Sequence, residues 1–593
     1  MSISSALKPK AWRILEPDAG LEAELTGSLP VSPVLRRILV NRGIRTLSEA
    51  QAFLTPDLDA MRDPSLLDGV DEAVERTRRA LAQGEKIMIH GDYDVDGVTS
   101  TALLVRVFRI LGADVSWYVP HRQREGYDIG LQAVETAKER GVGLIITADC
   151  GTSAVEPVAH ANSLGMDVIV TDHHEVGQEL APALVMINPR KPGCEYPFKG
   201  LAGVGVAFKF AEALVRECGY DTAAFRRRFC DLAAIGTVGD VVPLLDENRT
   251  LVKFGMQELS RTGKKGLKAL LDVSGATGRP ITSHMLAFSL APRLNAAGRL
   301  DDAAVALDLL LTSDDGQAAS LAQSLELHNK DRQSEQERIV KEAMDQIVSR
   351  GLESESKVFV LASAGWHPGV VGIVAGKIVD RYSRPAILVA VDETGEAGVG
   401  SARSIAAFDI FDALMRCSGL LDRCGGHSRA AGLSITMDRF SEFDSAINRI
   451  ADELLSDSDL TPQLEVDAVL ALDSVTRDLA YELKLLEPCG YCNREPVFMS
   501  ERALTLHKMK MGSTGAHLKL KLGTNLGEPL ECVAFGWGES DEAFRVGSLI
   551  DLCYNIQINE WGGRETVQMV LRDARSSEAV MSDPVHPDHA GIA

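Results

Sequence analysis

The stretch His90-Gly91-Asp92-Tyr93-Asp94-Val95-Asp96-Gly97 directly follows the run Lys86-Ile87-Met88-Ile89. This apolar run is typical of a buried strand, and the strand is expected to open into a turn at Gly97. On extended backbone, alternate side chains point the same way, so Asp92, Asp94 and Asp96 would lie on one side of the chain. Carboxylates this close repel one another, and a raised pKa or a bound cation relieves the repulsion. A solvated acidic turn or a calcium loop is the alternative, but Val98-Thr99-Ser100 does not continue the ligand spacing of a calcium loop. The stretch therefore predicts a metal site.

Length and composition limit the classes of protein that this chain can belong to. The 593 residues are enough for several domains, and a net charge of −22 argues against binding a polyanion by bulk charge. Any contact with nucleic acid must therefore come from local basic patches. Ten scattered cysteines suit a reducing compartment better than a disulfide framework. The N-terminus lacks an apolar signal core and no window reaches membrane-spanning length, so we expect a cytoplasmic protein with no membrane contact.

Strand and helix patterns alternate after residue 86. Near-continuous apolar runs at residues 115–119, 143–147 and 167–171 predict strands, and helical patterns separate them. This alternation is typical of a doubly wound parallel sheet with helices on both faces. We therefore expect an α/β catalytic domain over residues 81–312.

Several of these predicted strands are followed at once by acidic or imidazole side chains. Asp149 follows the strand at 143–147, and Asp172-His173-His174 follows the strand at 167–171. Asp240 follows the small, apolar stretch 233–239, which we count as a fourth strand end. Because the carboxyl ends of parallel strands form the ligand crevice of such sheets, these side chains are expected to converge.

The rest of the chain divides into further predicted segments. Residues 1–80 predict short helices with proline breaks, and residues 313–350 predict one long helix, either a connector between domains or a surface helix within one. Residues 351–455 predict a second α/β domain, and residues 463–575 a small β-barrel or sandwich. The tail, residues 576–593, is predicted to be disordered.

The donor types indicate which metal is bound. Carboxylates mixed with imidazole suit Mn²⁺, Mg²⁺ or Zn²⁺, and the lack of cysteine donors argues against structural zinc. The donors are too many for one ion and favour two: Asp94, Asp96, Asp149, His173 and Asp240. Two metal ions that lie close together stabilise both the attacking and the leaving oxygen in phosphoryl displacement. His174 is then free to contact a substrate phosphate or to support the site, and Asp172 to orient an imidazole.

Eight ordered motifs carry a family resemblance. Four lie in the predicted catalytic domain: residues 92–97, 147–151, 172–174 and 239–244. The others are residues 293–299, 365–372, 400–404, and 425–427 together with 430–432. The set resembles the DHH phosphoesterase superfamily and, within it, the RecJ-type single-strand-specific DNA exonucleases. The resemblance covers roughly residues 35 to 575.

This resemblance implies a fold and an activity. The fold would be a DHH domain and a DHHA1 domain facing each other across a cleft, joined by a long helix and followed by an OB-like domain. The activity would be Mn²⁺-dependent (Mg²⁺ possible) release of 5′-mononucleotides from the 5′ end of single-stranded DNA, in recombination and repair. A single-strand-binding protein and a helicase are the implied partners of a monomer.

The resemblance also implies site residues. The metal ligands would be the five donors named above, together with His90, which stands where family pyrophosphatases place a ligand although RecJ-type relatives differ there. The implied catalytic groups are Asp149, His174, Arg299 and His427, the last two clamping the scissile phosphate. Ser401 and Arg403 resemble a pocket for the terminal 5′ phosphate, and Arg122 or Arg124 would assist because guanidinium groups bind phosphate bidentately.

A single strand could be held by the C-terminal module. There Lys508, Lys510, Lys519 and Lys521 alternate with apolar residues, and we count Lys519 and Lys521 as DNA contacts. Tyr554 and Trp561 are candidate stacking groups. The alternative is a solvated lysine face over a small core. The run 226–228, three arginines, is expected to be a solvated helix turn.

Two other functions fit parts of the pattern. One is a DHH phosphatase or phosphodiesterase acting on short oligonucleotides or cyclic dinucleotides, which would not need the C-terminal module. The other is a DNA-binding factor on a catalytically dead scaffold, which predicts lost ligands, whereas the expected set is complete. The pair Cys489 and Cys492 has no second pair nearby, so we expect two thiols rather than a zinc site.

Overall fold

A computed structural model gives the structure of residues 10–122, 124–177, 179–300, 302–524, 527–561 and 563–577. The chain forms two compact units. The larger one contains residues 56–460 and 488–493, and the smaller one contains the N-terminal residues up to Thr55 together with 461–487 and the residues from Arg494 onward.

A five-stranded parallel sheet is the centre of the larger unit. Its strands are β2 (Ile87–Gly91), β3 (Val115–Tyr118), β4 (Leu144–Ala148), β5 (Asp167–Thr171) and β6 (Val185–Ile187). Their order in the sheet is β3-β2-β4-β5-β6, and every pairing is parallel. This is a doubly wound order, in which the chain changes direction between β2 and β4 and leaves a crevice at their carboxyl ends.

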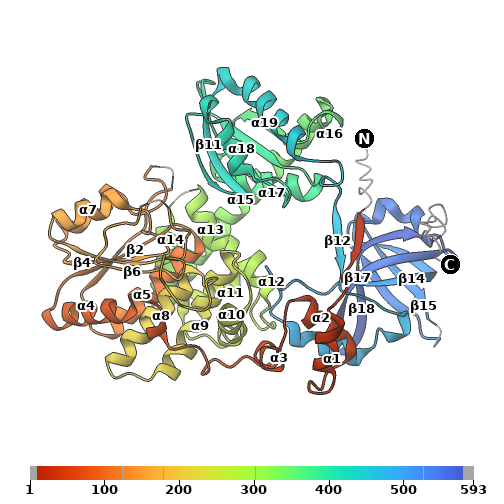
Figure 1. Cartoon of the computed structure of the whole chain (residues 1–593), viewed down its shortest axis with the longest axis horizontal. Coiled ribbons are helices and arrows are strands. Elements are labelled where there is room, and N and C mark those ends of the chain that lie inside the picture. Colours follow the sequence, from red (N-terminus) through yellow and green to blue (C-terminus); the bar gives the residue numbers. More distant parts are fainter. Residues whose placement is uncertain are drawn as a thin grey trace, which may run out of the picture. The chain divides into compact units, whose positions relative to one another are not determined.

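Helices cover both faces of this sheet (Figure 1). One core contains the apolar residues of α4 (Val70–Gln83), α5 (Val95–Ile110) and α8 (Gly203–Glu217). The other contains those of α6 (Leu131–Glu139) and α7 (Val155–Ser163). The predicted parallel, two-faced α/β architecture is confirmed.

The acidic stretch after β2 is not extended as we expected. Helix α5 already begins at Val95, and Asp94 is its N-cap, accepting hydrogen bonds from the backbone nitrogens of Asp96 and Gly97 at 2.9 and 3.1 Å. Asp96 therefore projects from the first helical turn rather than from alternate strand positions. The reason is capping: Asp94 satisfies backbone donors that the start of a helix leaves free.

The prediction that stretch 233–239 is a strand is wrong. It is the end of α9 (Thr222–Gly239), and Asp240 caps the carboxyl end of that helix. The small residues serve close helix packing, since a Cβ on Gly236 would lie 2.3 Å from Oγ1 of Thr99 in α5. Asp240 thus reaches the site from a helix end, not from a strand end.

Further helices complete the first domain. They are α10 (Asp246–Leu259), α11 (Lys265–Val273), α12 (Ser283–Met285), the π-helical turn η2 (Leu286–Leu290), α13 (Ala291–Leu300) and α14 (Ala304–Leu311).

Helix α15 (Asp315–Ser349) links this domain to the next one. Its N-terminal half contributes Ala318, Ala322 and Leu325 to the core that contains α4, α5 and α8. Its C-terminal half contributes Ile339 and Ala343 to a core of the second α/β domain. The helix is therefore buried at both ends in different cores, as a connector should be.

The second α/β domain has one mixed sheet. Its strands are β7 (Phe359–Ala364), β8 (Ala386–Val391), β9 (Ala397–Arg403), β10 (Arg423–His427) and β11 (Ala430–Thr436), in the order β10-β11-β9-β8-β7. Its helices are α16 (Leu352–Glu355), α17 (Pro368–Tyr382), α18 (Ile410–Arg416) and α19 (Phe440–Leu454).

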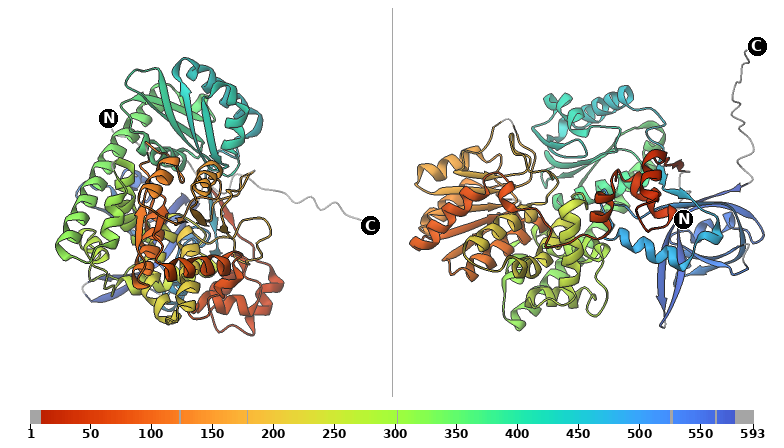
Figure 2. Two further views of the ribbon diagram at one scale, coloured as in Figure 1. Left: turned by 90° about the vertical axis from the view of Figure 1, so that its left-hand side faces the viewer. Right: turned by 60° about the horizontal axis from the view of Figure 1, so that its bottom comes forward.

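The smaller unit contains a β-barrel, drawn in blue in Figure 2. Its strands are β13 (Ala468–Val469), β14 (Phe498–Met511), β15 (His517–Gly523), β16 (Leu530–Ala534), β17 (Leu549–Trp561) and β18 (Arg564–Ser576). Strand β14 pairs with both β15 and β17, which closes the barrel.

Short helices accompany the barrel: α1 (Ala19–Thr26), α2 (Pro33–Asn41), α3 (Leu47–Leu54) and α20 (Arg477–Leu483). The N-terminal segment differs from the expected run of helices, because β1 (Ala11–Ile14) is a strand that pairs in parallel with β12 (Gln463–Val466). Disorder was predicted for residues 576–593; Ser576 instead ends β18, and residues 578–593 lie outside the described residues. None of the described helices is long and apolar enough to cross a bilayer.

Candidate metal centre

Three strands of the parallel sheet deliver their polar side chains to one edge. Asp92 and Asp94 follow β2, Asp149 follows β4, and His173 follows β5. Asp149 adopts the left-handed conformation, with φ of +67°, a strained geometry that is common at functional sites. Its carboxylate lies against Gly203 of α8, where an added Cβ would come within 2.4 Å of Oδ1.

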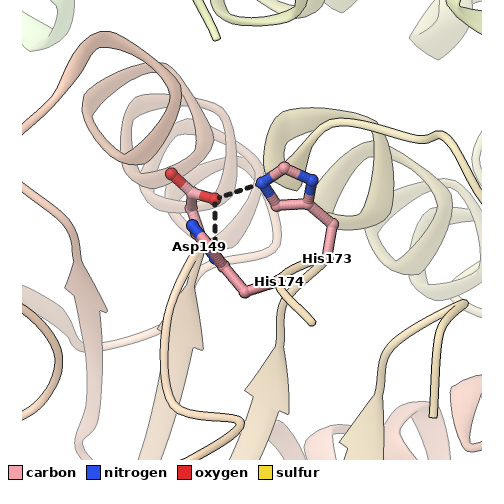
Figure 3. Close-up of side chains that lie close together, drawn as sticks. All are labelled: Asp149, His173 and His174. Atoms are coloured by element: carbon pink, nitrogen blue, oxygen red, sulfur yellow. Dashed lines mark ion pairs between the residues drawn. The ribbon is translucent and has the colours of Figure 1, made fainter. Parts of the chain in front are cut away.

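The side chains form three overlapping sets of possible ligands. Within each set the donor atoms lie within 4.8 Å of one another, and the sets are Asp92, Asp94 and Asp149; Asp149, His173 and His174; and Asp96, His173 and Asp240. Nε2 of His173 is 3.1 Å from Asp149, 3.5 Å from Asp240 and 3.8 Å from Asp96. Figure 3 shows Asp149 facing both imidazoles.

The sets share members and fit a pair of cations. Asp149 and His173 each belong to two sets, as residues between two neighbouring ions would. Oδ1 of Asp149, Oδ1 of Asp92 and both ring nitrogens of His173 are buried without a hydrogen-bond partner among the described residues. Buried polar atoms are normally satisfied, so the grouping of these atoms fits a set of ligands for a cation.

The charges of the cluster favour the same interpretation. Burial, together with the mutual repulsion of the carboxylates, raises the pKa of Asp92, Asp149 and Asp240 well above the usual range, and that of Asp96 to about 7. Burial lowers the pKa of His173 to about 3, which keeps this imidazole neutral and able to bind a metal. Metal ions would relieve the repulsion and restore the ionised carboxylates.

The pKa of His174 is raised, whereas that of His173 is lowered. Burial disfavours its charged form, but the hydrogen bond and the charge of Asp172, 2.8 Å away, raise the pKa of His174 to about 9. Burial alone would raise the pKa of Asp172, yet His174 holds it well below the usual range. The pair is therefore an imidazolium held by a carboxylate, able to donate a proton or a hydrogen bond.

The second α/β domain completes the site. A pocket of about 560 Å³ is lined by His173, His174 and Arg190 from the first domain, and by Phe411 and His427 from the second. Arg299 donates a hydrogen bond to the carbonyl of Gly369 in α17, at 3.1 Å. His427 and Arg299 thus lie where the two domains meet, as expected of groups that hold a substrate.

Three of the arginines predicted to bind phosphate lie near one another: Arg122, Arg299 and Arg403. Burial is the main cause that lowers the pKa of Arg299 to about 10, and the nearby positive charges of Arg122 and Arg403 act in the same direction. Ser401 and Arg403 lie together against Gly372, since both of their side chains are 3.2 Å from the Cβ position of that glycine. Like charges collected at one place favour an anionic ligand such as phosphate.

Other predicted residues lie elsewhere. His90 belongs to none of the ligand sets found among the described residues; its Nδ1 is 3.5 Å from Sγ of Cys150 and its ring stacks on Tyr118. Arg124 is exposed in the loop after β3, where its backbone nitrogen donates to the carbonyl of His121 at 3.1 Å.

In the barrel, Lys519 pairs with Glu531 at 2.9 Å and Lys521 is exposed. Tyr554 is fully buried and bonded to Ser500, so it cannot stack on bases. The side chain of Trp561 lies outside the described residues. Neither Cys489 nor Cys492 forms a disulfide with another described residue.

Sequence reasoning missed three residues of the site. Arg190 follows β6 and could have been found by the same rule that located Asp149, because it too stands beyond the carboxyl end of a strand. Asn295 accepts a hydrogen bond from the backbone of Val95 at 2.9 Å, and the hydroxyl of Tyr127 is 3.0 Å from Nδ1 of His174. No local signal marked these two contacts.

Comparison with known proteins identifies the family of the chain. The model of the DHH family N-terminal domain matches residues 86–237, that of the DHHA1 domain matches 355–453, and that of the RecJ OB domain matches 466–573. The chain is 42% identical to the single-stranded-DNA-specific exonuclease RecJ of Bacillus subtilis, over 96% of this chain and 72% of that protein. The chain belongs to the RecJ family.

Solved structures of RecJ from Thermus thermophilus agree with the fold. The structure in complex with Mn²⁺ has a TM-score of 0.82 at 32% identity and covers 95% of this chain and 79% of that one. The complex with Mg²⁺ has a TM-score of 0.75 at 31% identity, over 95% of this chain and 78% of that one. The α/β DHH domain, the DHHA1 domain and the OB-like barrel predicted above are therefore the domains of this family.

Proposed function

We propose that this protein is a single-strand-specific DNA exonuclease that hydrolyses phosphodiester bonds with two divalent cations. The observation that carries the proposal is the sharing of Asp149 and His173 between ligand sets at the edge of the parallel sheet. The names of the relatives support the substrate, and the Mn²⁺ and Mg²⁺ complexes of the Thermus protein support the type of ion.

We assign the ions to Asp94, Asp96, Asp149, His173 and Asp240, with Asp92 close enough to contribute. Mn²⁺ is the expected ion, and Mg²⁺ would fit the same oxygen-rich donors. When bound, such ions stabilise negative charge on both oxygens of a phosphoryl displacement. His90 stays a weaker candidate, because its free Nε2 is buried but no ligand set among the described residues includes it.

The protein's own groups would hold and protonate the substrate. Protonated His174, fixed by Asp172, would donate to a phosphate oxygen or to the leaving oxygen. His427 would hold the scissile phosphate from the wall of the pocket, and Arg299, which bonds to the carbonyl of Gly369, would hold it from the contact between the two domains. Asp149 lies between the two imidazoles and would fix the position of both ions.

The finer features are also proposals. We propose 5′-to-3′ polarity with release of 5′-mononucleotides, because Ser401 and Arg403 bring a hydroxyl and a guanidinium group together beside Gly372, where they could bind a 5′-terminal phosphate. Arg122 would assist, and Lys519 and Lys521 of the barrel would contact the strand farther along. A role in recombination and repair, a cytoplasmic location, a monomeric state, and partnership with a single-strand-binding protein and a helicase stay predictions from the family resemblance.

Digestion of one oligonucleotide carrying a 5′ label or a 3′ label, with and without Mn²⁺, tests the proposal. The 5′ label should appear at once in mononucleotides, and the strand that carries the 3′ label should become shorter step by step. Long strands that stay intact while dinucleotides are cleaved would instead favour the small-substrate phosphodiesterase. The variant Asp149→Ala should bind the strand without cleaving it, whereas a natural dead scaffold would show no cleavage before substitution.

A further inference from the structure

Two adjoining pockets lie on the helical side of the DHH domain, away from the metal centre. They have volumes of about 410 and 710 Å³ and share Arg261 and Thr262 as lining residues. The first is lined by the ends of α5 and α10, the middle of α9 and the start of α11, and the second runs along α11 to residue 281. We call the two pockets together the α11 groove.

The α11 groove is basic although the whole chain carries a net charge of −22. The first pocket is lined by five cations: Arg106, Arg228, Arg261, Lys264 and Lys265. The second adds Lys268 and Arg279. The acidic lining residues are Asp231, Glu258 and Asp272. The excess of positive charge is therefore local and cannot come from the average composition.

Only part of this charge is neutralised within the protein. Lys264 pairs with buried Asp231 at 2.7 Å, Lys265 pairs with Asp315 at 2.8 Å, and Arg261 pairs with Glu258. Arg228, Lys268 and Arg279 are exposed and make no ion pair within the part of the chain that the structure describes. These three cations face solvent around the groove.

Arg106, inside the first pocket, is also surrounded by more positive than negative charge. It is half-buried, and its Nε and Nη2 atoms both donate to the carbonyl of Leu310. Burial lowers its pKa, and the like charges of Arg109 and Arg228 lower it further against the single opposing charge of Asp231. An anion bound in the groove would relieve this repulsion.

The spacing of the cations indicates the class of anion. Arg228 and Lys264 lie at the N-terminal end of α11, and Arg279 lies beyond its C-terminal end. A helix of this length spans about 13 Å, the distance covered by roughly four phosphates of a stacked strand. Guanidinium groups in such a row bind phosphate bidentately, whereas one small anion would occupy only one end.

We propose that the α11 groove binds the sugar-phosphate backbone of the single strand at a place separate from the metal centre. The inference rests on the proposed action on single strands. Asp96 and Arg106 lie ten positions apart on α5, so the two places are separated by about 15 Å along that helix. A stacked strand must therefore have at least about five nucleotides to occupy both, and shorter stacked substrates would not use the groove.

The test removes the three unpaired cations together, as Arg228→Ala, Lys268→Ala and Arg279→Ala. A matched control removes three exposed cations elsewhere in the same unit, as Arg78→Ala, Arg79→Ala and Lys341→Ala. Binding of a fluorescent 30-nucleotide strand is measured by anisotropy in EDTA over a series of salt concentrations. Because no cleavage is needed, this result does not depend on whether the protein is a nuclease.

The groove variant should lose about tenfold in affinity, and the slope of log K against log salt should fall by about 2, since each single-strand phosphate contact contributes about 0.7. The control should change affinity less than about twofold. In Mn²⁺, trinucleotide hydrolysis should be unchanged and 30-nucleotide hydrolysis should show a raised KM.

Equal losses in the two triple variants, or an unchanged salt slope in the groove variant, would overturn the proposal. So would unchanged strand affinity combined with lost binding of a polyglutamate peptide, which would make the groove a site for acidic protein. Absence of hydrolysis in the wild type would overturn the proposed function but leave the binding result intact.

Discussion

Nε2 of His173 lies 3.1 Å from Oδ1 of Asp149, yet neither atom has a hydrogen-bond partner among the described residues. Both side chains are almost completely buried, so water cannot satisfy them freely. A nitrogen lone pair and a carboxylate oxygen that face the same small volume are the donors a divalent cation takes. This contact connects the fold to the proposed chemistry, because the two residues come from the ends of neighbouring strands.

Crowding the ligand Asp149 should weaken metal binding without unfolding the protein. In Gly203→Ala the new methyl would lie 2.4 Å from Oδ1 of Asp149, so that the carboxylate must move. We expect at least about tenfold weaker Mn²⁺ binding by calorimetry, which is about 1.4 kcal/mol. Gly376→Ala on α17 is the control, since nothing lies within 4 Å of its Cβ position; equal Mn²⁺ affinity in the two variants would refute this role for Gly203.

The pairing of His174 with Asp172 should make stability depend on pH in metal-free protein. The folded pKa of His174, about 9, lies above its ordinary value of 6.5, so the stabilisation is complete below pH 6.5 and is lost as the pH rises through 9. Because the imidazole is 36% exposed, we expect Asp172→Asn to cost only about 1 kcal/mol at pH 6.

Urea unfolding in EDTA at pH 6 and at pH 10 measures this effect. The difference between wild type and Asp172→Asn should shrink toward zero at the higher pH. Asp114→Asn, at an exposed position, serves as the reference and should be neutral throughout. A difference that grows with pH would have the opposite sign to the one argued here.

Tyr127 should position His174 for turnover. Its hydroxyl is 3.0 Å from Nδ1 of His174, and its neighbours Gly126 and Asp128 both adopt positive φ, at +86° and +79°. This loop conformation holds the tyrosine ring edge-on to the imidazole. We expect Tyr127→Phe to lower kcat about tenfold while Mn²⁺ affinity is unchanged, as expected when one hydrogen bond to a charged group is lost. Tyr220→Phe, at an exposed tyrosine, should leave both values unaltered, and a kcat equal to wild type in Tyr127→Phe would remove the proposed role.

Arg403 should determine the preference for a 5′ phosphate. The residue lies beside Ser401 against Gly372 and near Arg122 and Arg299. We expect Arg403→Ala to raise KM for 5′-phosphorylated strands by about tenfold or more and to change KM for 5′-hydroxyl strands little. Arg423→Ala, an exposed arginine of β10, is the matched control. An equal rise in KM for both strands would show that Arg403 does not read the terminal phosphate.

Much of the first domain could be predicted because its signals are local. The strand at 167–171 has the predicted bounds, since a buried parallel strand is a continuous apolar run between turn residues. Asp149 and His173 were located by one rule about strand ends. The rule about strand ends also located Asp240, but the stretch before it is the end of a helix and not a strand. The rule misread this stretch because alanine and glycine suit close helix packing as well as a short strand.

The remaining errors come from contacts between distant parts of the sequence. Strand β1 finds its partner β12 some 450 positions later, and four residues carry too little pattern to reveal such a pairing. Tyr127 reaches His174 only through the folded loop. Burial of Tyr554 depends on closure of the barrel, which alternation in one strand does not determine.

The number of Mn²⁺ ions bound per chain tests the central claim most directly. Equilibrium dialysis followed by elemental analysis should give about two ions for the wild type. The Asp149→Ala variant should retain fewer than one, because it loses a residue shared by two ligand sets. A wild-type protein that binds no Mn²⁺, or an Asp149→Ala variant that keeps both ions, would contradict the account.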